Sequence, residues 1–196
     1  AFGIMEFCDM ANIRDIDTNI IERSCNWLVK QQKADGHWST RSQLETNYNL
    51  TNDSATTAYI AWALASAGKC GPNVARALQW LDGQPELLDN NYILALTTNA
   101  ALLLDKNSSR ARSLSRTLAD KFQVDSGKNI AWLSGSGQGA VYSRGMSLDI
   151  ETTALGTIAL LEYGKETDLA VKAQKWLSQQ KDRYGTFQTT QATVLA

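Results

Sequence analysis

The hydrophobic positions of this chain recur with helical spacing, and they define two kinds of helix. Segments such as 58–65 are apolar on nearly every side, whereas segments such as 73–81 have one apolar face and one polar face. A helix that is apolar all round is usually buried on most of its surface, and an amphipathic helix keeps one face in water. The pattern therefore predicts buried helices that alternate with partly exposed ones.

The predicted apolar helices cover residues 1–12, 53–67, 91–104 and 149–163. The predicted amphipathic helices cover residues 19–33, 73–81, 109–122 and 167–180, and a last helix begins near Thr189 or Thr190. The polar stretch 39–52 and the glycine-rich stretch 127–145 are predicted loops, and no segment has the alternation of a β-strand. Helices of these two kinds pack best as two layers.

A repeat with an offset of 96 residues supports this architecture. Segment 53–58 returns as 149–154, Trp80 returns as Trp176, and the glycine after the first helix also recurs. A period of this size that spans a helix pair is typical of stacked helical hairpins. We therefore predict one all-α domain over 1–196, an α/α toroid with inner and outer helix rings that is incomplete at both ends.

The composition argues against some classes of function. With 19 basic and 20 acidic residues, the chain lacks the basic excess that favours nucleic acid binding. No apolar run approaches the roughly 20 residues that span a membrane. The chain starts at Ala1 without a leader pattern and stops within a predicted helix, so we interpret it as a fragment of a longer protein. Three cysteines without a CxxC pair are expected to be buried structural thiols.

Candidate catalytic and metal-binding groups are few. His37 is the only histidine and has no cysteine or histidine at ligand spacing, so we predict no metal site. The carboxyl pairs at 15 and 17 and at 149 and 151 stand two residues apart, so their side chains point in different directions on a helix. Helix capping is the better interpretation of Asp17, Asp53 and Asp149, with Ser54 as a second candidate cap for its helix. The glycines of 135–139 are expected to form a flexible inter-helix loop.

Two segments share a local signature of an outer helix that ends in Gln-Gln, followed by a turn glycine and an aromatic ring. These segments are 26–38 and 175–187. The glutamines can bond backbone groups left unpaired at the helix end, which is structural chemistry. Similar signatures occur in terpene cyclases such as squalene-hopene cyclase and in the thioester-containing domain of alpha-2-macroglobulins and complement proteins.

The run 184–196, Y-G-T-F-Q-T-T-Q-A-T-V-L-A, resembles the "G-G/S-F-x-S-T-Q-A-T-x-x-A" segment of the alpha-2-macroglobulin family. Residues 142–143 with 149–154 resemble that family's "Y-S-V-E-x-T-A" entry to an inner helix, with a short insertion. The resemblance covers the whole chain. It implies a broad-range protease inhibitor, complement-like in its thioester domain, that works outside the cell or in the periplasm and contacts target proteases and its own neighbouring domains.

The chain also departs from the family pattern. The reactive Cys-Gly-Glu-Gln or Cys-Leu-Glu-Gln run is absent from these 196 residues, and the family layout would place it upstream of Ala1. Some members carry a histidine in the loop that corresponds to 39–52, where this chain has none, and His37 is too early for that role. We therefore predict no catalytic residue, no cofactor and no enzymatic activity.

Three loop aromatics, Trp38, Trp132 and Tyr142, are candidates for a rim that faces neighbouring domains, because large aromatics in loops often make contacts. They can equally pack on their own helix ends. Two other functions stay open. A terpene cyclase or prenyltransferase-like enzyme would need an aromatic-lined central cavity with clustered carboxyls, and a thioester-less interaction module would need neither.

Overall fold

The computed structural model describes residues 1–39, 52–140 and 142–196. Its helices are α1 (Phe2–Ala11), α2 (Asn19–Gln31), α3 (Asp53–Ser66), α4 (Gly71–Asp82), α5 (Glu86–Asp89), α6 (Asn91–Asp105), α7 (Ser109–Asp120), α8 (Met146–Tyr163), α9 (Thr167–Gln179) and α10 (Thr190–Leu195). Two short strands, β1 (Gln123–Asp125) and β2 (Ile130–Trp132), lie between α7 and α8. The all-α class predicted from the sequence is confirmed, and the toroid stays a prediction.

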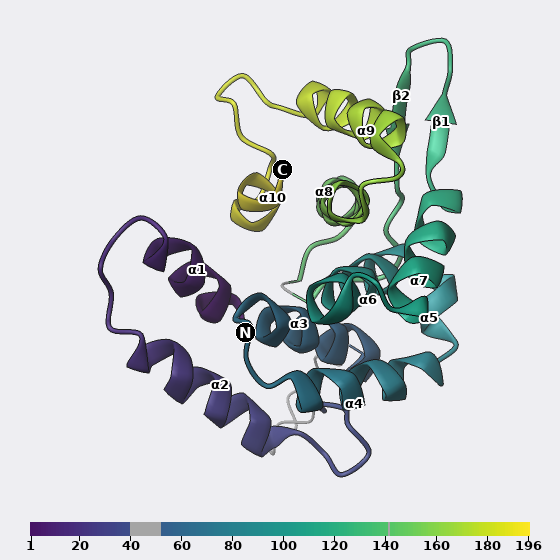
Figure 1. Ribbon diagram of the computed structural model, residues 1–196. Coiled ribbons are helices and arrows are strands. Elements are labelled where there is room, and N and C mark those ends of the chain that lie inside the picture. The colour runs from purple at the N-terminus through teal and green to yellow at the C-terminus, as the bar shows by residue number, and fades with distance from the viewer. Residues whose placement is uncertain (40–51, 141) are drawn as a thin grey trace.

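Helices α3, α6 and α8 form an inner layer, flanked by α1 beside α3 and by α10 beside α8 (Figure 1). Most side chains of the three central helices are buried. Helices α4, α7 and α9 lie outside and pack across the inner ones. Small residues such as Ala58, Ala61 and Ala154 are fully or almost fully buried, which lets the inner helices approach closely. The apolar helices predicted from the sequence thus form the inner layer, and the amphipathic helices α4, α7 and α9 form the outer one.

Two of the predicted helix caps differ from the structure. The cap of α3 is Asn52 rather than Asp53 or Ser54, because Asn52 Oδ1 accepts a 2.7 Å hydrogen bond from the Ala55 amide. Helix α8 begins at Met146, so Asp149 lies inside its first turn and is not the cap. The preceding glycine-rich sequence hides this start, since it carries no capping side chain.

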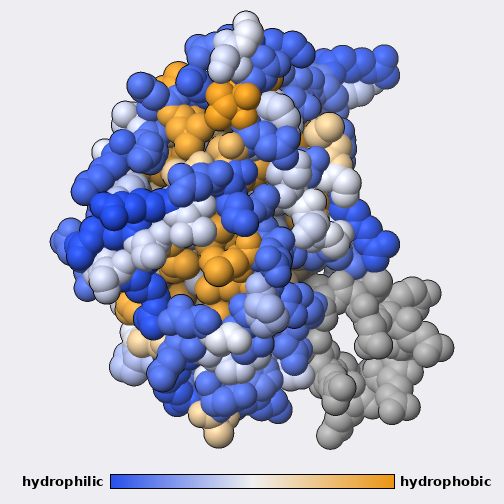
Figure 2. Space-filling view, turned by 90° about the vertical axis from the view of Figure 1, so that its right-hand side faces the viewer, coloured by the Kyte–Doolittle hydropathy of each residue, from blue (hydrophilic) through white to orange (hydrophobic). Residues whose placement is uncertain are grey.

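The strands were not predicted, because three residues are too few to establish an alternation of period two. They pair antiparallel, with Val124 opposite Ala131, and β2 packs against α9. The short helix α5 was also missed. The face with α5, α7 and the strands is mostly hydrophilic, with separate apolar patches between the polar side chains (Figure 2).

The sequence repeat extends to tertiary contacts. The hydroxyl of Thr57 on α3 accepts from the Trp38 amide at 3.0 Å and donates to its carbonyl at 3.4 Å. Thr153, 96 residues later on α8, makes the same pair of bonds with Leu133 at 3.0 and 3.2 Å. Helices α3 and α8 therefore each fix a segment that precedes them through one buried threonine.

The outer helices repeat a ring contact. Trp80 on α4 stacks on His37 with a centroid distance of 4.9 Å, and Trp176 on α9 stacks on Trp132 at 6.4 Å. Stacked aromatic pairs add about 0.5–1.5 kcal/mol to the energy of area burial. Trp132 therefore occupies the same place in the second repeat as His37 does in the first. The two residues differ in type, so the sequence alone does not reveal this equivalence.

The cysteines are free thiols. Cys25 is buried, whereas Cys8 and Cys70 are half-buried, so the predicted burial holds fully for one of the three. Burial raises the pKa of Cys25. Among the described residues, no helix combines the length and the apolar character that crossing a membrane requires.

Candidate functional site

Polar side chains from the inner helices α3, α6 and α8 and from the flanking helix α10 come together in the core. They are Tyr59 on α3, Tyr92 on α6, Glu151 on α8 and Gln191 on α10, and Ser143 joins them from the segment before α8. The Glu151 carboxyl interacts electrostatically with both tyrosine hydroxyls, and the Gln191 side chain interacts with the Tyr59 hydroxyl. We call these five residues the Glu151 cluster.

Glu151 is the most deeply buried member, with 0% of its surface exposed. Its Oε2 accepts a 2.7 Å hydrogen bond from the Ser143 hydroxyl, and its Oε1 has no partner among the described residues. Burial raises the pKa of Glu151, and the Ser143 hydrogen bond opposes that shift. Burial therefore favours the neutral, protonated form of the carboxyl. In that form Oε2 can still accept a hydrogen bond, while the other oxygen carries a proton that it can donate.

The two tyrosines of the cluster are neutral phenols. Burial is the main cause that raises the pKa of Tyr59 and of Tyr92, and the nearby Glu151 carboxyl raises both further. The Tyr92 hydroxyl accepts a 3.2 Å hydrogen bond from the Ala140 amide. Tyr92 therefore joins the cluster to the segment that precedes α8.

That segment together with the first two residues of α8, residues 139–140 and 142–147, is called the strap below. Gly139 and Ser143 are joined by a backbone hydrogen bond of 3.0 Å, and a side chain at position 139 would collide with the Ser143 hydroxyl. At the other end of the strap, Ser147 Oγ donates to Gln188 Oε1 at 3.2 Å. The strap is thus tied at both ends to the inner helices or to the segment before α10.

The hydroxyl–carboxyl pair of the cluster lies inside the core. Ser143 and Glu151 form a hydroxyl–carboxyl pair, but both side chains are buried, so a substrate in solution does not reach them. No histidine stands beside the pair to act as a general base. Among the described residues, no group of three His, Cys, Asp or Glu side chains is placed to hold a metal ion.

His37 has a different environment. Its Nδ1 lies 2.6 Å from Asp35 Oδ1 and its Nε2 lies 3.8 Å from Asp53 Oδ2, while the ring stacks on Trp80. The hydrogen bond with His37 is the largest cause that lowers the pKa of Asp35. His37 therefore ties the turn after α2 to α3 and α4. Residues 40–51, where some family members carry a histidine, lie outside the described residues.

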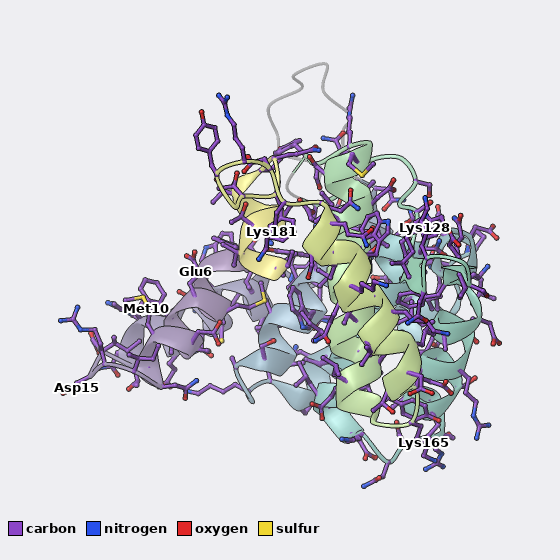
Figure 3. All side chains as sticks on the ribbon, turned by 90° about the horizontal axis from the view of Figure 1, so that it is seen from above. Glu6, Met10, Asp15, Lys128, Lys165 and Lys181 are labelled. Carbon is purple, nitrogen blue, oxygen red and sulfur yellow. The ribbon has the colours of Figure 1, made fainter. Side chains whose placement is uncertain are left out.

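The carboxyls that a cyclase would need are not brought together. Asp15 lies at the outer end of the α1–α2 pair (Figure 3), and Asp17 is exposed and accepts from the Asn19 amide at 3.0 Å. Asp149 is half-buried and accepts from the Gly135 amide at 2.7 Å, while burial raises its pKa. Only Glu151 of these residues is in the cluster. This distribution does not favour the terpene cyclase hypothesis.

The three predicted interface aromatics have different environments. Trp38 is 2% exposed and its indole donates a 2.7 Å hydrogen bond to the Leu28 carbonyl, so it packs on its own helix end. Trp132 is half-buried against Trp176. Tyr142 is 67% exposed on the strap. An interface role for Trp132 and Tyr142 stays a prediction.

Sequence reasoning considered Glu151 as a cyclase acid and placed Ser143, Glu151 and Gln191 in segments that resemble the alpha-2-macroglobulin family, but it did not predict that they form one cluster. One signal was available, because Glu151 is an acidic residue within a helix that is otherwise apolar. A charged residue at such a position needs a buried partner. The partner itself, Ser143, lies eight residues earlier in a loop, and only the family resemblance places it in one motif with Glu151.

The fold and the cluster define an all-α domain of helical hairpins with buried polar groups shared among its inner helices. Residues 1–196 match the family model described as "A-macroglobulin TED domain". The chain therefore belongs to the A-macroglobulin TED domain family.

Curated relatives agree with this assignment. The chain is 26% identical over 190 residues to thioester-containing protein 1 allele R1 of Anopheles gambiae, which covers 93% of the chain and 13% of that protein. It is 27% identical over 207 residues to complement C3 of Eptatretus burgeri, with 100% and 12% coverage. It is 26% identical over 210 residues to ovostatin of Gallus gallus, with 100% and 14% coverage. The chain thus spans about an eighth of the length of these relatives.

Proposed function

We propose that this chain is part of the thioester domain of an alpha-2-macroglobulin-like, broad-range protease inhibitor. Its role is that of a scaffold: its inner helices frame a reactive Cys–Gln thioester that lies outside residues 1–196. The observation that carries the proposal is the match of the whole chain to the A-macroglobulin TED domain family. The F-Q-T-T-Q-A-T run at 187–193 supports it independently.

The buried polar groups suit a scaffold. Tyr59, Tyr92 and Glu151 come from three different inner helices, so their shared environment fixes how those helices meet. Polar groups that are buried together make one helix arrangement more favourable than others, because alternative packings leave them without partners. A reactive bond that must stay dry until activation needs such a fixed surround.

The chain itself is proposed to have no enzymatic activity and no cofactor. Covalent capture in the parent would consume one thioester for each target, which is stoichiometric chemistry. The partners would be target proteases, through the parent protein, and neighbouring domains of the same chain. The parent is proposed to act outside the cell or in the periplasm.

A thioester-less interaction module is the second candidate. The residues that would separate it from the first candidate, a Cys-x-Glu-Gln run, are not among these 196 residues, and the family layout places them upstream of Ala1. In that case the same fold would support binding or steric trapping without a covalent bond.

Protease capture by the full-length parent tests the inhibitor proposal. The parent is incubated with trypsin and analysed on a denaturing, reducing gel, with methylamine-treated parent as the control. We expect an adduct of parent and protease that survives denaturation and decreases after methylamine treatment. Cleavage of the parent without any adduct would contradict covalent capture.

A further inference from the structure

The turn between α6 and α7 carries the sequence Asn107-Ser108-Ser109, which fits the acceptor pattern for N-linked glycosylation, called a sequon below. In a sequon an asparagine is followed two residues later by a serine or threonine, and the residue between them is not proline. Asparagines that carry a glycan lie in surface loops of secreted proteins. What separates a site from a chance match is therefore whether the asparagine and the hydroxyl are accessible.

Asn107 is exposed, and its side chain makes no hydrogen bond within the described part of the chain. The contacts of this residue use its backbone. Its amide donates to Asp105 Oδ1 at 3.0 Å, and its carbonyl accepts from the Arg112 guanidinium. Ser109, which supplies the hydroxyl of the sequon, is exposed at the start of α7. Both groups that a glycosyltransferase must reach are therefore on the surface.

The turn is held in place by the residues on either side of Asn107. Ser108 Oγ accepts a 3.1 Å hydrogen bond from the Ala111 amide and so caps α7. Lys106 pairs with Glu162 on α8 at 3.4 Å. Among the described residues, a glycan on the Asn107 side chain therefore replaces no existing hydrogen bond, and the folded domain can accommodate it.

Two other sequons begin at Asn49 and Asn52, and neither has this environment. Asn49 lies outside the described residues. The Asn52 side chain caps α3, and Ser54, which supplies the hydroxyl of that sequon, is only 4% exposed. Of the two described sequons, the one at Asn107 is thus the one whose asparagine and hydroxyl are both exposed.

We propose that Asn107 is an N-glycosylation site and that neighbouring domains of the parent leave the turn between α6 and α7 uncovered. In the reaction, Nδ2 of Asn107 forms a bond to the anomeric carbon of the first N-acetylglucosamine of a lipid-linked oligosaccharide. The bond between that carbon and the lipid diphosphate breaks, the diphosphate leaves with the lipid, and the amide loses one proton. The attached oligosaccharide is bulky and hydrated, so it is incompatible with a packed interface at this turn.

The proposed site and the Glu151 cluster lie at opposite ends of α6. Tyr92 of the cluster is in the first turn of this helix, and Asn107 follows its last turn. Helix α6 has 15 residues and rises about 1.5 Å per residue, so the two positions are roughly 20 Å apart. The site is thus separate from the cluster.

The inference rests on the proposed function in one respect, since it requires a parent that passes through a eukaryotic secretory pathway rather than into a periplasm. The curated relatives from Anopheles gambiae, Eptatretus burgeri and Gallus gallus are animal proteins, which supports this requirement. An intact thioester is not required.

Glycan mapping on the secreted full-length parent tests the inference. The parent is purified from its native source, digested to peptides and treated with peptide N-glycosidase F in heavy-oxygen water. This treatment converts each glycosylated asparagine to an aspartate that carries heavy oxygen. We expect mass spectrometry to find the label at Asn107. Secreted parent in which Asn107 is unlabelled would overturn the inference.

Two adjacent serine variants separate the sequon from the helix cap. Ser109→Ala destroys the sequon and should abolish the label at Asn107. Ser108→Ala is the matched control, because it removes the cap of α7 but keeps the sequon, so the label should remain. Ser108→Thr keeps both the cap and the sequon and serves as the control if the loss of the cap impairs folding. Equal labelling of the Ser109 variant and the control would contradict glycosylation at this sequon.

Enzyme access tests whether the turn is uncovered in the parent. Peptide N-glycosidase F should release the Asn107 glycan from native parent, before any denaturation. Release only after denaturation would show that the turn is covered and would overturn that part of the inference. Failure of methylamine labelling would instead concern only the proposed thioester, so the two failures are distinguishable.

Discussion

The Ser143 hydroxyl donates a 2.7 Å hydrogen bond to Glu151, and this buried contact joins the exposed strap to the helical core. Glu151 stands on α8 among residues that are almost all apolar. Because its carboxyl is buried, its protonation state affects both the stability of the core and the anchoring of the strap.

Stability should fall with rising pH because of Glu151. The folded-state pKa of Glu151 is raised above the ordinary value of 4.5, so the folded protein retains a proton that the unfolded chain loses. The stabilising effect is complete below about pH 4.5 and is lost as pH rises through the folded pKa, with a slope of at most about 1.4 kcal/mol per pH unit. Glu151→Gln, which is always neutral, should lack this dependence. Urea unfolding of both proteins at about pH 4.5, 6 and 7.5 measures the difference.

Glu162→Gln is the control for that experiment, because Glu162 lies on the same helix, is exposed and pairs with Lys106 at 3.4 Å. Exposed pairs contribute about 0–1 kcal/mol, so this variant should keep the wild-type pH profile. A Glu151→Gln protein whose stability runs parallel to wild type across this range would show that Glu151 is not the responsible group.

The threonine contact of each repeat should carry a measurable share of stability. Thr153→Val removes the hydroxyl that bonds both the amide and the carbonyl of Leu133, and it leaves a buried amide without a partner. The expected cost is about 1–3 kcal/mol of unfolding free energy. Thr157→Val is the matched control, because the Thr157 hydroxyl bonds only the Thr153 carbonyl in its own helix. It should cost less than about 1 kcal/mol, and equal urea midpoints for the two variants would contradict the assignment.

Two equivalent turn glycines should respond differently to alanine. Gly36 has φ of +107° and Gly185 has φ of +80°, so both substitutions strain the backbone by about 1–2 kcal/mol. A Cβ on Gly36 would also lie 2.6 Å from the Arg76 carbonyl oxygen, whereas a Cβ on Gly185 would have open space. Gly36→Ala should therefore be the more destabilising by a further 1–3 kcal/mol, roughly the cost of overpacking. Thermal unfolding compares the two, and a smaller loss for Gly36→Ala would be inconsistent with the close turn–helix contact.

The helices were predictable because each depends on the sequence within a few turns. Apolar runs such as 58–65 identify buried helices, and the offset of 96 residues identifies the repeating pair. The strap and the Glu151 cluster were not predictable in this way. The bond between the Ala140 amide and Tyr92 joins residues 48 apart, and nothing local to either residue indicates it.

The equivalence of His37 and Trp132 illustrates the same limit. The two residues differ in chemistry, yet each stacks on the tryptophan of an outer helix, Trp80 or Trp176. The tryptophans repeat in the sequence because both occupy the same helix position. Their ring partners come from a turn and a strand, where several kinds of side chain can fill the same space. The stacking contact is therefore repeated in the structure although the partner residue is not repeated in the sequence.

Methylamine labelling of the native full-length parent tests most directly whether this chain frames a thioester. Methylamine opens an internal thioester and stays attached to the former glutamine. Mass spectrometry should find one labelled glutamine upstream of Ala1 and none within residues 1–196. Freshly purified native parent without any labelled glutamine would contradict the thioester scaffold and leave the thioester-less module as the function.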